Sequence, residues 1–288
     1  MSLSHFLLNY SLRFSVDNTN FEALLSKIVI IPTYNERENI VAIINAVFKL
    51  HQDFHVLVID DSSPDGTADI VRNIQLQYDG LLFLEERKGK LGLGTAYIYG
   101  FRWALQRGYQ YICEMDADFS HNPKDLQRLV NACMDGADVA VGSRYVPGGK
   151  IENWPWDRHI YSRGGSFYTR MITWMPVKDS TAGFVCYRRE VLETINLDQI
   201  KFVGYAFQIE MKFAAWKLGF RIVEVPITFI DRKLGVSKMN KGIIKEGVLG
   251  VLTIQWNSLF KSYRKKLKSA PVVNTPQTEY ANNVLTRV

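Results

Sequence analysis

The sequence predicts an α/β fold with a mainly parallel sheet and helices on both of its faces. Short, continuously apolar runs alternate with amphipathic segments of helical spacing from residue 27 to residue 142, a succession that is typical of parallel strands joined by helices. The chain has 288 residues, of which 47% are hydrophobic, so it can bury a sizeable core. In open sheets of this class, ligands bind beyond the carboxyl ends of the strands.

Two strand–helix units come first. The β-branched run KIVII (27–31) precedes ERENIVAIINAVFKLH (36–51), and HVLVI (55–59) leads through the turn DDSSPDGT into ADIVRNIQLQ (68–77). In the first predicted helix the apolar residues recur on one helical face: Ile40, Ile43, Ile44, Val47 and Phe48.

Three further strands follow in the same manner. LLFL (81–84) leads through a glycine-bearing loop into TAYIYGFRWALQRG (95–108), and YQYICEM (109–115) leads through an acidic turn into KDLQRLVNACM (124–134). ADVAVG (137–142) is predicted as another buried strand. These units complete the β-α-β-α succession from which the sheet is inferred.

Polar residues gather where the predicted strands end. PTYNE (32–36), DDSSPDG (60–66), DADFS (116–120) and SRY (143–145) each follow an apolar run. Because the carboxyl ends of parallel strands meet at one edge, these segments predict one site.

Asp116 and Asp118 are the most informative pair at this edge. Like charges one residue apart repel and resist desolvation, so folding alone gives little reason to place them at the end of a buried strand. With no histidine or cysteine beside them, their oxygens are suited to Mg²⁺ or Mn²⁺ bound together with substrate phosphates. The alternative is a turn whose carboxylates cap the next helix. Similarly, DDSSPDGT is a favourable turn sequence without any ligand. A turn does not, however, explain why two aspartates, Asp60 and Asp61, are paired at the end of the strand.

The net charge narrows the class of partner, and the cysteine content narrows the cellular compartment. A net charge of +6 and a pI of about 9.1 favour anionic partners such as phosphates, nucleic acid or a membrane surface. The three cysteines lie far apart without a C-x-x-C pair, which argues against a disulfide framework and a zinc site and favours a reducing compartment.

The two ends are expected to lie outside the main domain. Residues 1–26 lack the features of a secretory signal and are predicted to be a poorly ordered extension. Residues 242–268 are predicted to form an apolar and basic helical segment: the uncharged stretch 247–260 has 14 residues, short of the roughly 20 that a spanning helix needs. Five cations follow it, and residues 269–288 read as a disordered polar tail.

Nine blocks, in this order and spacing, resemble the polyprenol-phosphate (dolichol-phosphate) mannose synthases among the family 2 glycosyltransferases. They cover about residues 27–258: IVIIPTYNERENI, VLVIDDSSPDGTADIV, RKGKLGLGTAYIYGF, EMDADFSHNPKDLQRLV, VGSRYVPGG, SRGGSFYTR, DSTAGFVCYRREVL, GYAFQIEM and EVPITFIDRKLGVSKM. The resemblance implies a Rossmann-like GT-A catalytic domain over residues 27–241. It also implies transfer of mannose from GDP-mannose to a polyprenyl or dolichyl phosphate, with inversion at the sugar carbon.

The resemblance further implies roles for particular residues. Asp116 and Asp118 would hold the metal, and Arg232 and Lys238 would act with them in catalysis by stabilising charge on the departing diphosphate. Arg163 would orient the acceptor phosphate, which is an ionised nucleophile near neutral pH and needs no general base. The donor would be bound by Pro32, Tyr34, Glu36, Ile59, Asp61, Asp116, Ala117, Asp118, Arg144, Arg232 and Lys238.

Three residues in these blocks stay open. Asp179 and Glu210 have no assigned role beyond organising the site, and an ion-paired or surface position explains Glu210 equally well. Some relatives carry glutamine two residues after the D-x-D motif as a third oxygen near the metal, whereas this chain has Ser120. Metal affinity and choice are therefore open.

The expected location is the cytoplasm, at the surface of a membrane, because a polyprenol chain stays in the bilayer. Members of the family often carry membrane-spanning helices or recruit a membrane-bound partner, so an anchoring partner is a further expectation. A polyprenyl-phosphate glucosyltransferase or another family 2 transferase is the main alternative. A nucleic-acid-binding module is disfavoured because the chain has no aromatic-basic recognition motif. A nicotinamide oxidoreductase would need a glycine fingerprint where this chain has PTYNE.

Overall fold

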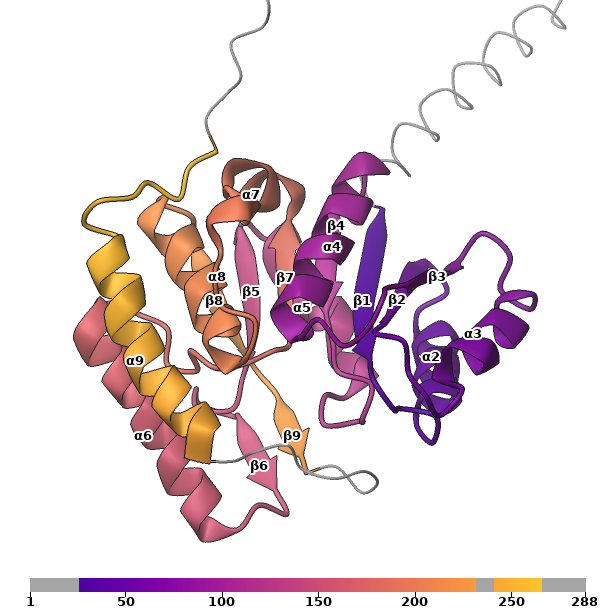
Figure 1. The fold of residues 1–288 in the computed structure, drawn as a ribbon, viewed down its shortest axis with the longest axis horizontal. Coiled ribbons are helices and arrows are strands. Elements are labelled where there is room, and N and C mark those ends of the chain that lie inside the picture. Colours follow the sequence, from indigo (N-terminus) through magenta and orange to yellow (C-terminus); the bar gives the residue numbers. More distant parts are fainter. Residues whose placement is uncertain (1–25, 232–240, 266–288) are drawn as a thin grey trace, which may run out of the picture.

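The computed structural model describes residues 26–231 and 241–265 and is organised around a seven-stranded sheet (Figure 1). The strands of this sheet are β1 (Lys27–Thr33), β2 (Phe54–Asp60), β3 (Leu82–Glu86), β4 (Tyr111–Glu114), β5 (Val139–Ser143), β7 (Val185–Arg188) and β8 (Ile222–Pro226). Their order is β3-β2-β1-β4-β7-β5-β8. Only β7 runs antiparallel to its neighbours β4 and β5, so the predicted mainly parallel sheet is confirmed.

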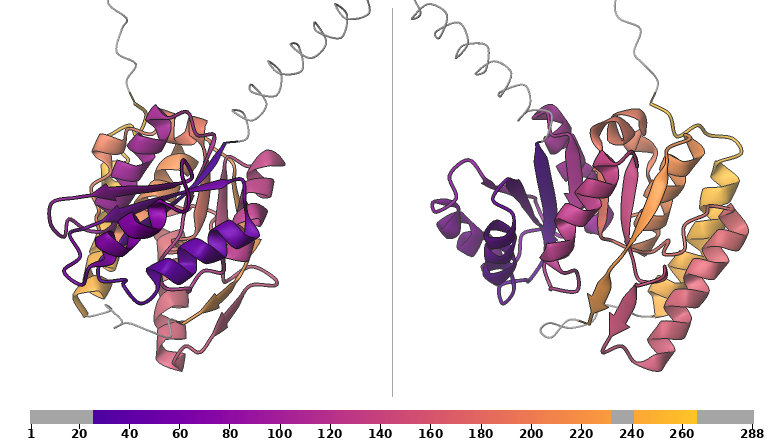
Figure 2. Two further views of the ribbon diagram at one scale, coloured as in Figure 1. Left: turned by 90° about the vertical axis from the view of Figure 1, so that its right-hand side faces the viewer. Right: turned by 180° about the vertical axis from the view of Figure 1, so that it is seen from behind.

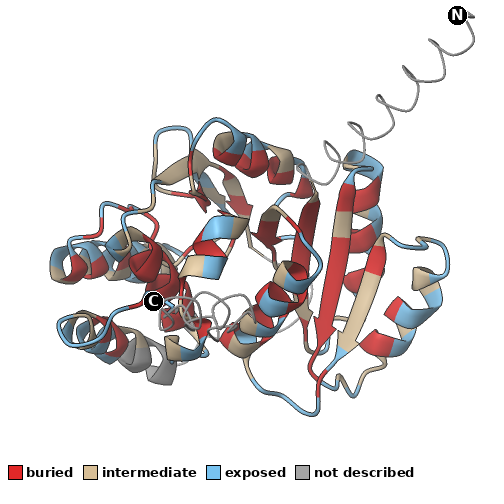
Figure 3. Ribbon diagram, turned by 90° about the horizontal axis from the view of Figure 1, so that it is seen from above, coloured by how far each residue is buried: buried red, intermediate tan, exposed pale blue. Residues whose placement is uncertain are grey.

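Helices cover both faces of the sheet. They are α2 (Ile40–Leu50), α3 (Thr67–Gln75), α4 (Leu93–Gln106), α5 (Leu126–Met134), α6 (Trp156–Thr173), α7 (Arg189–Thr194), α8 (Tyr205–Lys217) and α9 (Lys241–Asn257), with short 3₁₀ turns at Pro123–Asp125 and Leu197–Gln199. Alternate residues of β1 enter separate cores: Ile28 and Ile30 pack with residues of α4 and α8, whereas Val29 and Ile31 pack with residues of α2 and α5. This alternation is the period of two that a strand imposes. Figure 3 shows the central strands buried along most of their length.

The predicted elements up to residue 142 are present, with shifts of a few residues at their ends. The helix predicted from residue 36 begins at Ile40, because residues 37–39 form a turn in which the Ile40 amide donates to the Glu36 carbonyl at 2.9 Å. All five apolar residues assigned to its inner face are buried. The sequence did not reveal that β7 is antiparallel, because its direction depends on pairing with β4 and β5 rather than on its own residues.

The carboxyl ends of β1, β2, β4 and β5 lie at the same edge of the sheet, as predicted. A small parallel pair, β6 (Lys150–Glu152) and β9 (Thr228–Ile230), continues from this edge (Figure 1). Three loops at this edge each contain a non-glycine residue in the left-handed region: Asn35 (φ 60°), Ser62 (φ 54°) and Phe119 (φ 60°). Such backbone strain tends to gather at functional sites.

Helices α6 and α9 lie side by side along one flank of the molecule (Figures 1 and 2). Helix α9 corresponds to the helical segment predicted over residues 242–268, but it ends at Asn257. The prediction that the helix continues through the basic residues is wrong for residues 258–265, the part of that stretch that the structure describes. There Tyr263 is buried against Phe213, and the Lys265 amide donates to the Thr194 carbonyl at 2.8 Å. These tertiary contacts hold the chain in a non-helical course.

In the described ranges, no helix combines the length and apolarity needed to cross a membrane. Three predictions fall outside these ranges: the N-terminal extension, the loop containing Arg232 and Lys238, and the polar tail.

Candidate active site

The loops after β1 and β2 form one connected platform. The backbone amides of Asn35, Glu36 and Arg37 donate to side-chain oxygens of Ser63, Thr67 and Asp65, at 3.0, 3.1 and 3.1 Å respectively. The Asp60 carboxylate supports this platform, because it accepts from the Thr33 hydroxyl at 2.8 Å and from the Ser63 amide at 2.8 Å. The turn therefore accounts for the presence of a carboxylate at Asp60.

Three residues predicted to bind the donor lie on this platform. Pro32 is in the last part of β1, and Tyr34 and Glu36 follow in the loop, all three partly exposed. The Lys90 ammonium lies 4.3 Å from the centre of the Tyr34 ring, a cation–π distance. Lys90 was not singled out from the sequence, although it stands in one of the recognised blocks, and it adds a cation to this edge.

Asp61 and Ile59, which were predicted to border the base, both have close neighbours within the protein. The Asp61 carboxylate accepts from the Arg87 guanidinium at 2.7 Å and from the amides of Leu91 and Gly92 at 3.0 and 3.3 Å. These donors use most of its acceptor capacity, which favours a role in holding the loop before α4 over contact with a base.

The Ile59 side chain is fully buried beneath α4, where a β-carbon added to Gly100 would lie 2.8 Å from its δ-carbon. The Ile59 side chain is therefore part of the core, and the predicted position of Ile59 at the border of the base stays a prediction.

The acidic pair follows β4 directly. The Asp116 side chain is 39% exposed, whereas Ala117 and Asp118 are buried, and Asp118 Oδ1 accepts from the Ser120 amide at 3.0 Å. His121 Nδ1 accepts from the Asp116 amide at 3.4 Å and lies 3.8 Å from Asp116 Oδ2. Burial lowers the pKa of His121 to about 4, so the imidazole is neutral at neutral pH and adds no charge beside the carboxylates.

The donor set fits a hard divalent ion that also binds a substrate. No cluster of three or more His, Cys, Asp or Glu side chains with a metal-binding arrangement occurs in the part of the chain that the structure describes. Two carboxylates at a loop edge are nevertheless sufficient for Mg²⁺ or Mn²⁺ when substrate phosphates and water complete the shell.

Arg144 is held rigidly by Asp179. Its Nε and a terminal nitrogen donate to the two oxygens of Asp179 at 2.7 and 2.6 Å, and its backbone amide donates to the same carboxylate at 2.9 Å. The Asp179 amide in turn donates to Glu224 of β8 at 2.9 Å. Asp179, which had no assigned role, thus orients the arginine that was predicted to bind the donor.

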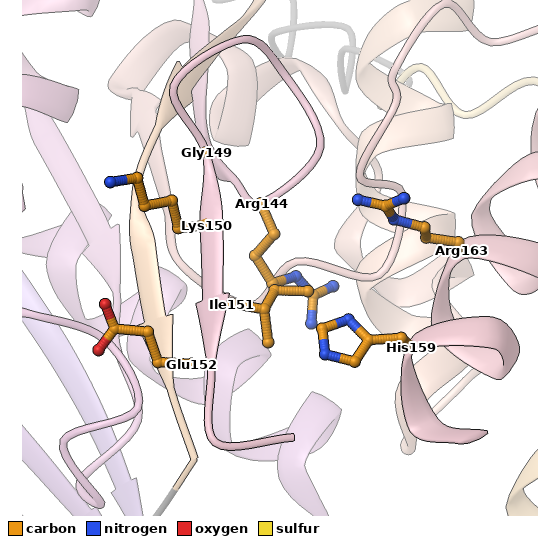
Figure 4. A pocket seen from close by; sticks show the side chains of 7 residues that line it. All are labelled: Arg144, Gly149, Lys150, Ile151, Glu152, His159 and Arg163. Carbon is orange, nitrogen blue, oxygen red and sulfur yellow. The ribbon is translucent and has the colours of Figure 1, made fainter. Parts of the chain in front are cut away.

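A cationic pocket of about 310 Å³ opens beside Arg144 (Figure 4). Arg163 and His159 extend toward it from α6, and Lys150 and Glu152 belong to β6. The excess of basic groups favours an anionic ligand. His159 and Lys150 were not predicted, and no sequence motif distinguishes them.

The ring of Phe229 is close to residues of both the pocket and the acidic segment. Its centre is 5.3 Å from the Arg144 guanidinium carbon and 5.5 Å from the centre of the His121 ring. The pocket and the two carboxylates are therefore adjacent parts of one site, although neither Asp116 nor Asp118 lines the pocket.

A buried polar network lies under the acidic pair. Gln208 of α8 donates to Glu114 Oε2 at 2.8 Å, and Lys212 donates to the carbonyls of Ala182 and Gln208 at 2.7 and 2.9 Å. Burial raises the pKa of Glu114 and lowers that of Lys212. The network ties β4 and α8 to the segment that carries Asp179.

Glu210 has a structural position. It is buried, and its Oε2 accepts from the backbone amides of Lys201 and Phe202 at 2.8 and 3.1 Å. This arrangement supports the loop before α8, so Glu210 has a structural role that is neither the surface position nor the ion pair considered from the sequence.

Comparisons with known proteins agree with this geometry. The family model described as "Glycosyl transferase family 2" matches residues 28–195. The chain is 48% identical to the polyprenol monophosphomannose synthase of Mycolicibacterium smegmatis over 78% of this chain and 84% of that protein. It is 46% identical to the undecaprenyl-phosphate mannosyltransferase of Micrococcus luteus over 81% of this chain and 96% of that protein.

Solved structures show the same fold at low sequence identity. A crystal structure of glucosyl-3-phosphoglycerate synthase from Mycobacterium tuberculosis, in complex with Mn²⁺, uridine diphosphate and phosphoglyceric acid, superimposes with a TM-score of 0.62. The two sequences are 15% identical, and the match covers 81% of this chain and 80% of that one.

Proposed function

Because the chain belongs to glycosyl transferase family 2, with the GT-A fold that its motifs imply, we propose that it transfers mannose to a polyprenyl phosphate and forms polyprenol-phosphate mannose. The observation that carries this function is the identity of 46–48% to two mannosyltransferases of that specificity over most of their length. The site is compatible with it, because a cationic pocket adjoins two carboxylates at one edge of the sheet.

The donor in this proposal is GDP-mannose. Its nucleotide would lie on the platform formed by Pro32, Tyr34 and Glu36, with its diphosphate toward Asp116 and Asp118. A divalent ion held by these two carboxylates would neutralise charge on the departing diphosphate. Arg232 and Lys238, predicted to assist there, lie outside the described residues.

The acceptor phosphate would occupy the pocket between Arg144 and Arg163, which changes the proposed ligand of Arg144 from the donor expected from the sequence to the acceptor. A phosphate monoester is already ionised near neutral pH, so it can attack the sugar carbon without a general base. Arg144 is fixed by Asp179 and loses little conformational entropy when an anion binds. Arg163 is exposed on α6, so it can reach a ligand that arrives from outside.

A donor panel tests the function directly. Purified protein is incubated with a short polyprenyl phosphate, Mg²⁺ or Mn²⁺, and GDP-mannose, GDP-glucose, UDP-glucose or UDP-mannose, and the lipid-linked sugar is measured. We expect product with GDP-mannose. Product with UDP-glucose alone would instead identify a polyprenyl-phosphate glucosyltransferase, the main alternative.

A matched pair of arginines tests the acceptor pocket. Arg163→Ala should raise the acceptor KM at least about tenfold, the usual scale for loss of a charge-assisted contact, with the donor KM unchanged. Arg170→Ala is the control, because Arg170 is an exposed arginine of the same helix that does not line the pocket. Equal effects of the two substitutions would contradict the assignment.

The acceptor also implies where the protein works. A polyprenol chain remains in the bilayer, so the site must approach the headgroups of a membrane. Peripheral attachment to the cytoplasmic face, alone or through a membrane-bound partner, completes the proposal.

A further inference from the structure

Lys212 of α8 has a side chain that lies entirely inside the protein. Lysine is almost never fully buried unless it is paired, because removal of an ammonium group from water is costly. Lys27, the other buried lysine among the described residues, forms an ion pair with Asp53. The ammonium group of Lys212 instead donates to three neutral oxygens, which are the Ala182 carbonyl at 2.7 Å, the Gln208 carbonyl at 2.9 Å and Gln208 Oε1 at 3.3 Å. An ammonium group has three N–H donors, so the three acceptors match it.

The Ala182 carbonyl belongs to a tight turn, residues 179–182, that holds Arg144. The turn is closed by the Ala182 amide, which donates to the Asp179 carbonyl at 3.3 Å. The Arg144 guanidinium donates to both carboxylate oxygens of Asp179, and to the Thr181 hydroxyl at 3.0 Å. Three hydrogen bonds of the guanidinium therefore end on this turn, and its orientation depends on where the turn lies.

The turn is fixed at both of its ends. At the start, the Asp179 amide donates to the carboxylate of Glu224 in β8 at 2.9 Å. At the end, the Ala182 carbonyl accepts from the Lys212 ammonium at 2.7 Å. Asp179 and Ala182 are both buried, so water does not compete for these contacts. Removal of the ammonium would therefore loosen one end of the turn and leave the Ala182 carbonyl buried without this donor.

The same ammonium is linked to the acidic segment through Gln208. Gln208 Oε1 accepts from Lys212, and Gln208 Nε2 donates to Glu114 Oε2 at 2.8 Å. Glu114 is the last residue of β4 and stands two positions before Asp116. All three side chains of this chain of hydrogen bonds are buried, and a satisfied buried network of this kind rigidifies the segments that it joins. Lys212 thus connects the turn that holds Arg144 with the strand that carries the acidic pair.

We propose that Lys212 is a positioning residue, whose buried ammonium holds the turn 179–182 where it aims Arg144 into the cationic pocket. This inference rests on the proposed function, in which Arg144 binds the acceptor phosphate. Arg144 lines the pocket, whereas Lys212 is fully buried and does not line it, so Lys212 acts through the turn. An arginine that is already held in its binding orientation loses less conformational entropy when an anion binds. Loss of the ammonium should therefore weaken acceptor binding more than donor binding.

Lys212→Met tests this role, and Lys27→Met is the matched control. Methionine keeps most of the apolar length of lysine and removes the ammonium group. Lys27 is also buried, but it lies at the start of β1, at the opposite edge of the sheet from the site. Its replacement removes a buried ammonium and should leave the pocket unchanged. Thermal melting of the two variants measures the stability that each has lost.

The kinetic comparison uses the full chain with GDP-mannose, Mg²⁺ and a short, detergent-soluble polyprenyl phosphate, at a temperature where all variants are folded. Lys212→Met should raise the acceptor KM about fivefold to tenfold, the scale of one lost hydrogen bond, and the donor KM less than about twofold. Lys27→Met should change neither KM. An unchanged acceptor KM in Lys212→Met, or an equal rise in both variants, would overturn the proposal.

A double-mutant cycle with Arg144→Ala shows whether Lys212 acts through Arg144. In the variant that combines Arg144→Ala and Lys212→Met, the acceptor KM should stay within about twofold of that of Arg144→Ala alone, because the group that Lys212 positions is absent. A general loss of stability would instead add to the effect of Arg144→Ala. A further rise of about fivefold or more in the combined variant would therefore refute the positioning role.

The orientation of Arg144 can also be measured without any substrate. Its Nε–H donates to Asp179 at 2.7 Å and gives a side-chain signal in a ¹⁵N NMR spectrum, which is assigned by its loss in Arg144→Lys. Exchange of this proton with water should be at least about tenfold faster in Lys212→Met, because the turn opens more often, and unchanged in Lys27→Met. Equal exchange in the wild type and Lys212→Met would contradict the proposal.

Two provisions keep the outcomes distinct. If Lys212→Met does not fold, Lys212→Gln replaces it, because glutamine retains an uncharged donor; the acceptor KM and the exchange rate should change in the same direction, and no change in either would refute the role. Faster exchange in Lys212→Met, together with a wild type that transfers no mannose, would refute only the proposed function. Normal transfer by the wild type, with exchange and acceptor KM unchanged in the variant, would refute only the role of Lys212.

Discussion

Replacement of Asp179 by asparagine removes the counter-ion of Arg144 with almost no change in volume. Asp179 is fully buried and the Arg144 side chain is 8% exposed, so water cannot compensate for the lost charge. Loss of one partner of a buried ion pair costs about 3–5 kcal/mol. The asparagine oxygen still accepts one hydrogen bond, and Thr181 still accepts from Arg144 at 3.0 Å. We therefore expect the lower end, about 3 kcal/mol.

This destabilisation is large enough to measure by thermal melting. For a domain of this size, each kcal/mol lowers Tm by about 2–4 °C, so Asp179→Asn should melt roughly 6–12 °C below the wild type. Mannose transfer should also fall, because the freed guanidinium is no longer aimed into the pocket. The acceptor KM should rise more than the donor KM, measured below the melting range of the variant.

The control is Asp198→Asn, which breaks the ion pair between Asp198 and Arg102 on the surface. The Asp198 side chain is 84% exposed, and exposed pairs contribute about 0–1 kcal/mol. If Asp179→Asn melted within 2 °C of Asp198→Asn, the pairing would not have the strength inferred from its burial. Loss of stability with normal acceptor KM would show that Asp179 supports the fold without orienting Arg144 for binding.

Three other predictions concern charged or titratable residues. Asp118→Asn should abolish transfer that depends on Mg²⁺ or Mn²⁺ and leave Tm unchanged or higher, since it relieves repulsion with Asp116; near-normal turnover would contradict the metal assignment. Arg232→Ala and Lys238→Ala should each lower kcat more than donor affinity, because charge on the leaving group grows in the transition state, and a raised KM at constant kcat would count against this role. Burial lowers the pKa of His121 from 6.5 to about 4. The unfolded chain therefore takes up this proton at a higher pH than the folded chain does. The stability contributed by the neutral imidazole is complete above pH 6.5 and is lost as the pH falls through about 4, in total roughly 3 kcal/mol. Urea unfolding of the wild type and His121→Gln at pH 7 and pH 4.5 measures this difference, and parallel curves would refute it.

Local sequence was sufficient to predict most of the framework. The apolar runs and helical spacings between residues 27 and 142 identified the strands and helices there, because secondary structure follows a period of two or 3.6 residues that can be read from near neighbours. The same reasoning placed Asp116 and Asp118 at the end of a buried strand, where β4 ends at Glu114. The order of the motifs identified the family, which the comparisons confirmed.

Sequence alone did not reveal the partners of the buried charges. Asp179 stands 35 residues from Arg144, and Asp61 stands 26 residues from Arg87. Whether a carboxylate faces a ligand or an arginine depends on which loops the sheet brings together. The sequence therefore did not reveal the groups that donate to the carboxylates of Asp61 and Glu210, which the structure shows.

Other features also depended on tertiary structure. The antiparallel direction of β7 is set by its pairing with β4 and β5, and the end of α9 is set by the burial of Tyr263 against α8. Apolar residues such as Ile160 and Phe167 recur with a helical period in the sequence of α6, but a period cannot say whether they face the core or water. They are exposed because Tyr168 and Ile172 of the same helix pack against the core instead, and burial is a property of the packed molecule rather than of a segment.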